Sequence, residues 1–165
     1  MDFDSVFATL YPSLYRYLHR LTGDEDAAED IAQEAFVRLL RQSLPEAEIR
    51  PWLFTVAMNL VRDRARKSER RKRLLTTAPP LVTRPELPDE EMERTQRIHG
   101  VRDVLDGLPE RDRQLLLMRE EGFKYDEIAA VIGVAPASVG TLIARALKKF
   151  VSAYEAREDV DDPRD

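Results

Sequence analysis

Two charged segments of opposite sign hold the residues best suited to binding chemistry. Residues 24–34 contain six acids and no base, whereas residues 62–73 contain eight bases and two acids, in a chain of 165 residues with net charge −5. Clustered carboxylates suit a basic partner or a divalent cation such as Mg²⁺, and a dense basic run suits phosphates. Each block alone is also compatible with a solvated helix face, so the blocks indicate separate surfaces without yet defining their partners.

Catalytic chemistry finds little support in the sequence. The chain has no cysteine, which excludes disulfides and thiolate metal sites, and its two histidines, His19 and His99, lie far apart. It also lacks a glycine-rich phosphate loop. We therefore predict no catalytic residue, no metal and no cofactor. A metal-dependent nuclease or hydrolase using the acids of residues 24–34 is an alternative that cleavage of labelled DNA would reveal.

The sequence has no apolar run long enough to predict a membrane-spanning helix. No stretch approaches eighteen consecutive apolar residues, and the first residues, MDFDSVF, include no apolar signal region. The lack of cysteine fits a reducing compartment. We therefore predict a cytoplasmic protein with no membrane insertion.

Residues 126–149, DEIAAVIGVAPASVGTLIARALKK, have the spacing of a helix-turn-helix. Ala129 is small enough for two helices to cross, Gly133 suits a turn with positive φ, and Val134 and Val139 suit the core between them. An ordinary helical hairpin is the alternative. If the element reads DNA, the expected reading helix presents few charges toward the duplex.

Four polar residues lie on the outward face of that helix. Ser138 and Thr141 can reach phosphates or base edges, and Arg145 and Lys148 can hold the backbone. Gly140 costs about 1 kcal/mol of helix stability relative to alanine. Binding by this element alone is therefore expected to be weak, and a second DNA site in the same molecule would strengthen it through effective concentration. The basic run of residues 62–73 is the candidate.

Apolar residues spaced three and four apart predict that these surfaces are carried by helices. The expected helices span residues 3–21, about 24 to before Pro45, Pro51 through the basic run, 98–108, 109–122, 126–132 and about 136–154. Between them, residues 74–93 are rich in proline and show no helical period, which predicts a linker. With no strand pattern, we predict an all-α fold of two small helical domains joined by a flexible linker.

Three segments in this order resemble the sigma-70 family of sigma factors. AEDIAQEAFVRLLR (residues 28–41) is similar to the polymerase-binding segment of region 2, and PWLFTVAMNLVRDRARKSERRKR (residues 51–73) to the helix that melts and reads the minus-ten element. Residues 108–150 are similar to region 4. The small size and bare linker resemble the extracytoplasmic-function (ECF) group. The implied domains are region 2 at 1–73, a linker at 74–94, region 4 at 95–156 and an acidic tail at 157–165.

The resemblance implies partners and roles. The partners are RNA polymerase core, through its β′ clamp and β subunits, promoter DNA and an anti-sigma factor. The linker would pass toward the polymerase active site. The residues implied for each surface are Asp30, Gln33 and Glu34 for polymerase binding; Asn59, Arg62, Arg66 and Lys67 for the minus-ten element; and Ser138, Thr141, Arg145 and Lys148 for the minus-thirty-five element.

The sequence also departs from the family pattern. Lys124 replaces a common serine cap before the helix-turn-helix, a loss worth about 1 kcal/mol. Gly140 and Leu142 replace common basic residues, and residues 43–50 form a short version of the loop that captures a flipped base. Trp52 is expected in the core, with stacking on a base as the alternative. The alternative function is a stand-alone regulator that binds a palindrome as a dimer.

Overall fold

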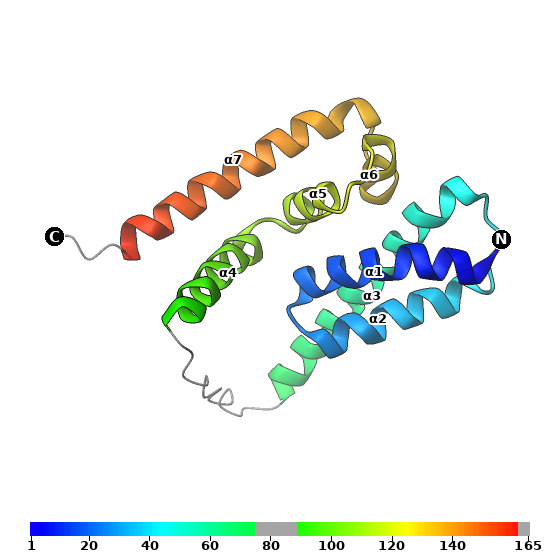
Figure 1. The fold of residues 1–165 in the computed structure, drawn as a ribbon, viewed down its shortest axis with the longest axis horizontal. Helices are drawn as coiled ribbons and strands as arrows, with labels where there is room; N and C mark the ends of the chain where they lie inside the picture. The colour runs from blue at the N-terminus through cyan, green and yellow to red at the C-terminus, as the bar shows by residue number, and fades with distance from the viewer. Residues whose placement is uncertain (75–88, 162–165) are drawn as a thin grey trace.

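The computed structural model describes residues 1–74 and 89–161, and within these ranges every regular element is an α-helix. This confirms the all-α prediction. The helices, in chain order, are α1 (Phe3–Thr22), α2 (Glu25–Leu39), α3 (Glu46–Leu74), α4 (Asp89–Gly107), α5 (Glu110–Glu120), α6 (Tyr125–Ile132) and α7 (Pro136–Asp161). Figure 1 shows α1–α3 as one group and α4–α7 as a second group beside it.

The turn between α1 and α2 follows directly from its residues. Gly23 adopts φ +68°, and its N–H donates to the carbonyl of His19 at 2.8 Å, which ends α1. Asp24 then begins α2 by accepting a hydrogen bond from the N–H of Ala27 at 3.1 Å. The two helices therefore run side by side, and small residues of α2 allow close packing on α1. The buried residues of α2 are Ala27, Ala28, Ile31, Ala32, Ala35, Phe36 and Leu39.

The third helix begins earlier than the sequence suggested. Pro51 was expected at its first position, yet α3 starts at Glu46 and accommodates Pro51 inside. Glu46 and Glu48 lie in the first turn, where acids favour the helix dipole. Most of the short loop predicted at residues 43–50 is therefore helical. Trp52 packs partly buried against the core, as expected.

The α4–α7 group contains the helix-turn-helix. Gly133 ends α6 with φ +79°, and Val139, Ile143 and Ala146 of α7 are buried. Two boundaries differ from expectation. Residues 89–94 of the predicted linker are already helical, and the rest of that linker from 75 lies outside the described residues. At the other end, α7 continues through residues 157–161 of the predicted acidic tail.

The two groups share one hydrophobic core, which the sequence did not predict. Phe54 of α3 and Phe123, in the turn after α5, have ring centroids 4.5 Å apart in an edge-to-face arrangement. Buried residues from Leu14 of α1 through Ile143 of α7 form a single continuous cluster. The two helix groups therefore pack directly against each other: α1 contacts α5, and α3 contacts α6 (Figure 1).

Among the described residues, no helix taken singly has the length and apolarity needed to cross a membrane. Within the part of the chain that the structure describes, α6 and α7 meet that measure only when taken together, and they are bent by 87° at the turn between them.

Candidate nucleic-acid interface

The outward face of α7 carries the four residues predicted to contact the minus-thirty-five element. Ser138, Thr141, Arg145 and Lys148 are all exposed, while Val139, on the opposite side, is fully buried. Their spacing of three, four and three residues places them along one helix face. Two hydroxyls near the helix start and two cations further along can meet base edges and phosphates respectively.

Gly140 borders this face and has a packing neighbour. A methyl group added at Gly140 would lie 3.4 Å from Cε2 of the Tyr125 ring, at the start of α6. Tyr125 itself is 46% exposed. The glycine thus lies beside an aromatic ring at the edge of the predicted reading surface, an arrangement that helical periodicity does not predict.

The start of α6 compensates in part for the missing serine cap. Lysine has no side-chain acceptor, so Lys124 cannot cap the helix with its own side chain. The Glu127 carboxylate instead accepts a hydrogen bond from the Lys124 backbone N–H at 2.8 Å. This is one half of a capping box, and it supports helix initiation from the opposite end of the first turn.

The basic half of α3 carries the residues predicted for the minus-ten element. Asn59, Arg62, Arg66 and Lys67 are exposed. Asn59 accepts a hydrogen bond from Arg62 at 3.4 Å, so these two side chains lie together. Arg62 also pairs with Glu110 of α5 at 2.6 Å. One predicted DNA-binding residue is therefore held by a carboxylate from the other helix group.

The predicted polymerase-binding residues lie on the exposed face of α2. The Asp30 and Glu34 side chains are 65% and 49% exposed, and Gln33 donates to Glu29 at 3.1 Å. Asp30 pairs with Arg64 of α3 at 3.6 Å, and Glu34 pairs with Arg38 at 2.9 Å. These acids form one wall of a groove whose other wall is the basic half of α3.

A cluster of charges that the sequence did not predict lies where the two helix groups meet. Glu121, at the end of α5, accepts from Arg16 at 3.0 Å, from Arg20 at 3.3 Å and from Ser13 at 3.2 Å. Its side chain is only 4% exposed. No periodic pattern links residues more than a hundred positions apart, so only the fold could reveal this contact.

Arg50 of α3 adds a second part to that cluster. Its guanidinium donates to the Glu121 carbonyl at 2.8 Å and to Glu127 at 3.5 Å, and its Cζ lies 3.9 Å from the centre of the Phe123 ring. Tyr17 lies nearby on α1, with its hydroxyl donating to Sδ of Met58 at 3.1 Å. Burial is the main cause that raises the pKa of Tyr17 well above its usual range.

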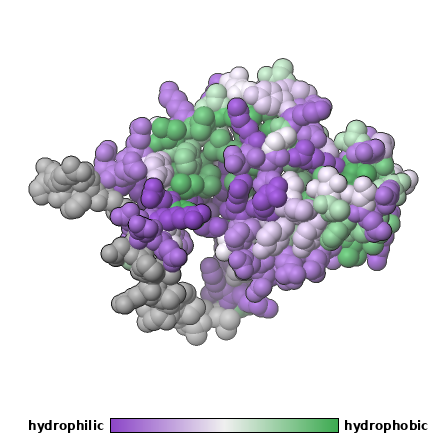
Figure 2. Space-filling view, viewed as in Figure 1, coloured by the Kyte–Doolittle hydropathy of each residue, from purple (hydrophilic) through white to green (hydrophobic). Residues whose placement is uncertain are grey.

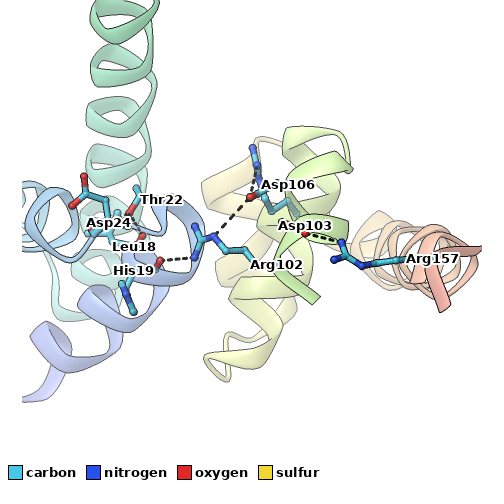
Figure 3. Close-up of polar contacts among 9 residues, drawn as sticks. Leu18, His19, Thr22, Asp24, Arg102, Asp103, Asp106 and Arg157 are labelled. Carbon is cyan, nitrogen blue, oxygen red and sulfur yellow. Dashed lines mark hydrogen bonds and ion pairs between the residues drawn. The ribbon is translucent and has the colours of Figure 1, made fainter. Parts of the chain in front are cut away.

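A third contact joins the groups at the α1–α2 turn. Figure 3 shows Arg102 extending from α4 toward the end of α1, where it donates to the His19 carbonyl at 3.5 Å. Its guanidinium lies directly over Gly23, in space that any larger side chain would occupy. A carboxylate oxygen of Asp106 forms an ion pair with Nε of the same guanidinium at 3.8 Å. A cation at a helix C-terminus is also favoured by the helix dipole.

Within residues 1–74 and 89–161, the acids and histidines form no group of three suited to a metal ion.

Comparison with known proteins identifies both helix groups. Residues 6–71 match the Sigma-70 region 2 family, and residues 99–150 match the family described as Sigma-70, region 4. The ECF RNA polymerase sigma factor EcfG of Rhodopseudomonas palustris is 30% identical over 151 residues, which cover 89% of this chain and 81% of the relative. SigM of Bacillus subtilis, also an ECF RNA polymerase sigma factor, is 27% identical over 93% of this chain and 96% of its own.

Solved structures agree on the fold. The sigma factor RpoE from Bartonella quintana, in complex with the anti-sigma factor NepR, is similar with a TM-score of 0.67 and 20% identity, over 93% of this chain and 97% of that one. CnrH, in complex with the cytosolic domain of CnrY, is similar with a TM-score of 0.65 and 22% identity, over 93% and 88% of the two chains.

The chain belongs to the sigma-70 family of RNA polymerase sigma factors. Within that family its relatives are ECF sigma factors, and it directs transcription initiation as they do. This confirms the resemblance inferred from the three sequence segments. The dimeric-regulator alternative is not favoured.

Proposed function

We propose that this ECF sigma factor docks on polymerase core through α2 and contacts promoter DNA through α3 and α7. One observation carries the docking role: Asp30, Gln33 and Glu34 lie on the exposed face of α2, while its opposite face is buried. Exposed acids on a rigid helix suit a basic surface, for which we propose the β′ clamp. The β subunit would complete the contact with core.

The DNA roles rest on exposure and chemistry. Amide and cationic groups that suit the bases and phosphates of an opened strand run from the middle of α3 into its basic half, at Asn59, Arg62, Arg66 and Lys67. Ser138, Thr141, Arg145 and Lys148 suit a duplex major groove at the minus-thirty-five element. The charge of −5 weakens binding to DNA away from polymerase.

We further propose that an anti-sigma factor controls this protein. One similar structure is the sigma factor RpoE in complex with the anti-sigma factor NepR, and another is CnrH in complex with the cytosolic domain of CnrY. We also propose that the chain is not an enzyme and works in the cytoplasm, where promoter DNA and polymerase are found in bacteria.

A core-binding assay tests the docking role. Asp30→Arg with Glu34→Arg reverses two exposed charges, so we expect at least a tenfold loss of core affinity with the helical circular dichroism unchanged. Glu155→Arg with Glu158→Arg is the matched control, since it reverses two exposed acids on the far end of α7. Equal binding by both variants would show that α2 does not dock on core.

Protection of DNA by the wild-type chain, measured with and without polymerase, distinguishes a sigma factor from a stand-alone regulator. A sigma factor protects an asymmetric promoter only when polymerase is present. If the chain alone protects a symmetric DNA site and does not bind core, the polymerase-dependent roles proposed for α2, α3 and α7 are wrong.

A further inference from the structure

The groove between α2 and the basic half of α3 has the size of a ligand site. Its volume is about 660 Å³, and small-molecule sites typically measure about 300–1,000 Å³. Figure 1 shows the two helices that form its walls, which contact each other directly. Its cations outnumber its carboxylates and are Arg38 of α2 with Arg64, Lys67 and Arg71 of α3. The α2–α3 groove is therefore suited to an anion.

The cations of α3 form a row along one wall of the groove. Arg64, Lys67 and Arg71 are spaced three and four residues apart, which places them on one face of the helix. They extend over about 10 Å along the helix axis. Ser68 lies on the same wall, and its hydroxyl can donate a hydrogen bond to a phosphate oxygen. A row of this kind can hold several linked phosphates.

The pairing of charges leaves two of these cations available. The ion pairs among the groove residues are Glu34–Arg38 at 2.9 Å and Asp30–Arg64 at 3.6 Å. Within the part of the chain that the structure describes, Lys67 and Arg71 form no ion pair, and both are exposed. An anion that binds them need not displace a carboxylate of the protein.

The base of the groove is apolar. Ile31 is only 4% exposed, and Leu60 is partly buried against the core. An organic group could rest on these two side chains, while Asp30 and Glu34 accept hydrogen bonds from its hydroxyl or amino groups. Small-molecule sites commonly combine an apolar surface with a few polar groups in this way.

We propose that the α2–α3 groove binds a small polyphosphate, either free or as part of a nucleotide, with its phosphates on Lys67, Ser68 and Arg71. Because Asp30 and Glu34 line the same groove, the bound ligand competes with polymerase core for α2. This competition rests on the proposed docking role of α2, whereas the ligand site itself rests on the groove alone.

Isothermal titration calorimetry of the full-length chain tests the site. The probes are inorganic tripolyphosphate and ATP, in buffer without divalent cations. We expect one probe molecule to bind per chain, with an affinity that falls as salt is added, because the cations are exposed. An affinity for tripolyphosphate that equals or exceeds that for ATP assigns the site to polyphosphate alone, and tighter binding of ATP assigns it to a nucleotide. The absence of saturable binding by both probes would overturn the proposal.

Charge reversal identifies the residues responsible. Lys67→Glu with Arg71→Glu should weaken tripolyphosphate binding by about tenfold or more, because it removes the charge-assisted hydrogen bonds to phosphate. Arg70→Glu with Arg73→Glu is the matched control, since it makes the same charge change at exposed positions of α3 outside the groove. The control should change the affinity by no more than about twofold.

An equal loss of affinity in the two double variants would show diffuse attraction to the basic helix and would overturn the site. Circular dichroism verifies that both variants are folded. If the groove variant does not fold, Ser68→Asp places one carboxylate in the groove at an exposed position and should also weaken tripolyphosphate binding. Unchanged affinity of that variant would count against the site.

Core affinity measured with and without tripolyphosphate tests the competition. At a concentration about ten times its Kd, the probe should weaken core binding by the wild type by about tenfold, as a simple competitor does. Core binding by the Lys67→Glu, Arg71→Glu chain should not respond, which separates the groove from any effect of the probe on polymerase, since that effect would appear with both chains.

Unchanged core affinity of the wild type in saturating tripolyphosphate would overturn the competition. Failure of the wild type to bind core without the probe would instead contradict the docking role of α2, and calorimetry would still decide whether the groove is a ligand site.

Discussion

The guanidinium of Arg50 in region 2 lies over the ring of Phe123 in region 4, with its Cζ 3.9 Å from the ring centre. The same group donates at 2.8 Å to the carbonyl of Glu121. A single side chain therefore joins the two regions by a cation–π contact and by a hydrogen bond to the backbone.

Arg50→Ala should lower the free energy of unfolding by about 1–3 kcal/mol, because it removes the cation–π contact and leaves a carbonyl without its donor. Urea denaturation followed by circular dichroism measures the change. Arg38→Ala is the matched control, since Arg38 makes only an exposed i,i+4 pair with Glu34, and its removal should cost no more than about 0.5 kcal/mol. Equal losses would mean that Arg50 contributes no more than a surface pair.

Asp24→Ala should destabilise the protein by about 1 kcal/mol, because Asp24 accepts the N–H of Ala27 at the start of α2. Asp24→Asn keeps a side-chain oxygen acceptor and should retain most of that stability. Thermal unfolding of the two variants beside the wild type separates the hydrogen bond from the charge. If the asparagine variant is as unstable as the alanine variant, the charge near the helix dipole is the main contribution.

Gly140→Ala should stabilise the chain by up to about 1 kcal/mol, because glycine is a poor helix former and a new methyl group would meet Tyr125 at ordinary contact distance, 3.4 Å. The melting temperature measures this gain. A decrease would show that the Tyr125 ring cannot yield. DNA affinity of the same variant reports separately whether the methyl group hinders approach to the duplex.

Tyr17 contributes a stability that is lost at high pH. Burial is the largest cause raising its pKa in the folded state, with Glu110 adding to it and Arg113 and Arg62 opposing it. An unfolded tyrosine ionises near pH 10, so the contribution is complete below pH 10 and is lost as pH rises further, by about 1.4 kcal/mol per unit.

Unfolding measured between pH 9 and 11 tests this expectation. The free energy of unfolding of Tyr17→Phe should fall less steeply above pH 10 than that of the wild type. Tyr125→Phe, at an exposed ring, controls for the loss of one hydroxyl. Parallel pH profiles for the wild type and Tyr17→Phe would contradict the assigned cause.

Local periodicity explains what the sequence could predict. The stripe of Ala28, Ile31 and Ala35, and the inward positions Val139 and Ile143, repeat at helical spacing, so the helices and their buried faces followed from the residues. The predicted start of α3 at Pro51 was wrong, because proline is common at the first position of a helix but lies inside this one.

Pairing across the chain could not be predicted in that way. Glu121 contacts Arg16 and Arg20 only because the turn after α5 meets α1, and no single-sequence pattern encodes that meeting. The polymerase and DNA residues came from the resemblance, and their roles stay predictions. Similarity to known proteins identifies the family of the chain.

The 29-residue helix α3 is about 44 Å long as one continuous rod. Arg50 near its start meets region 4, Asn59 and Arg62 occupy its middle, and Arg64 and Lys67 form a wall of the groove against α2. A stiff rod transmits displacement along its length. A partner that tilted this helix at the groove against α2 would therefore also displace Arg50 and its contacts with region 4.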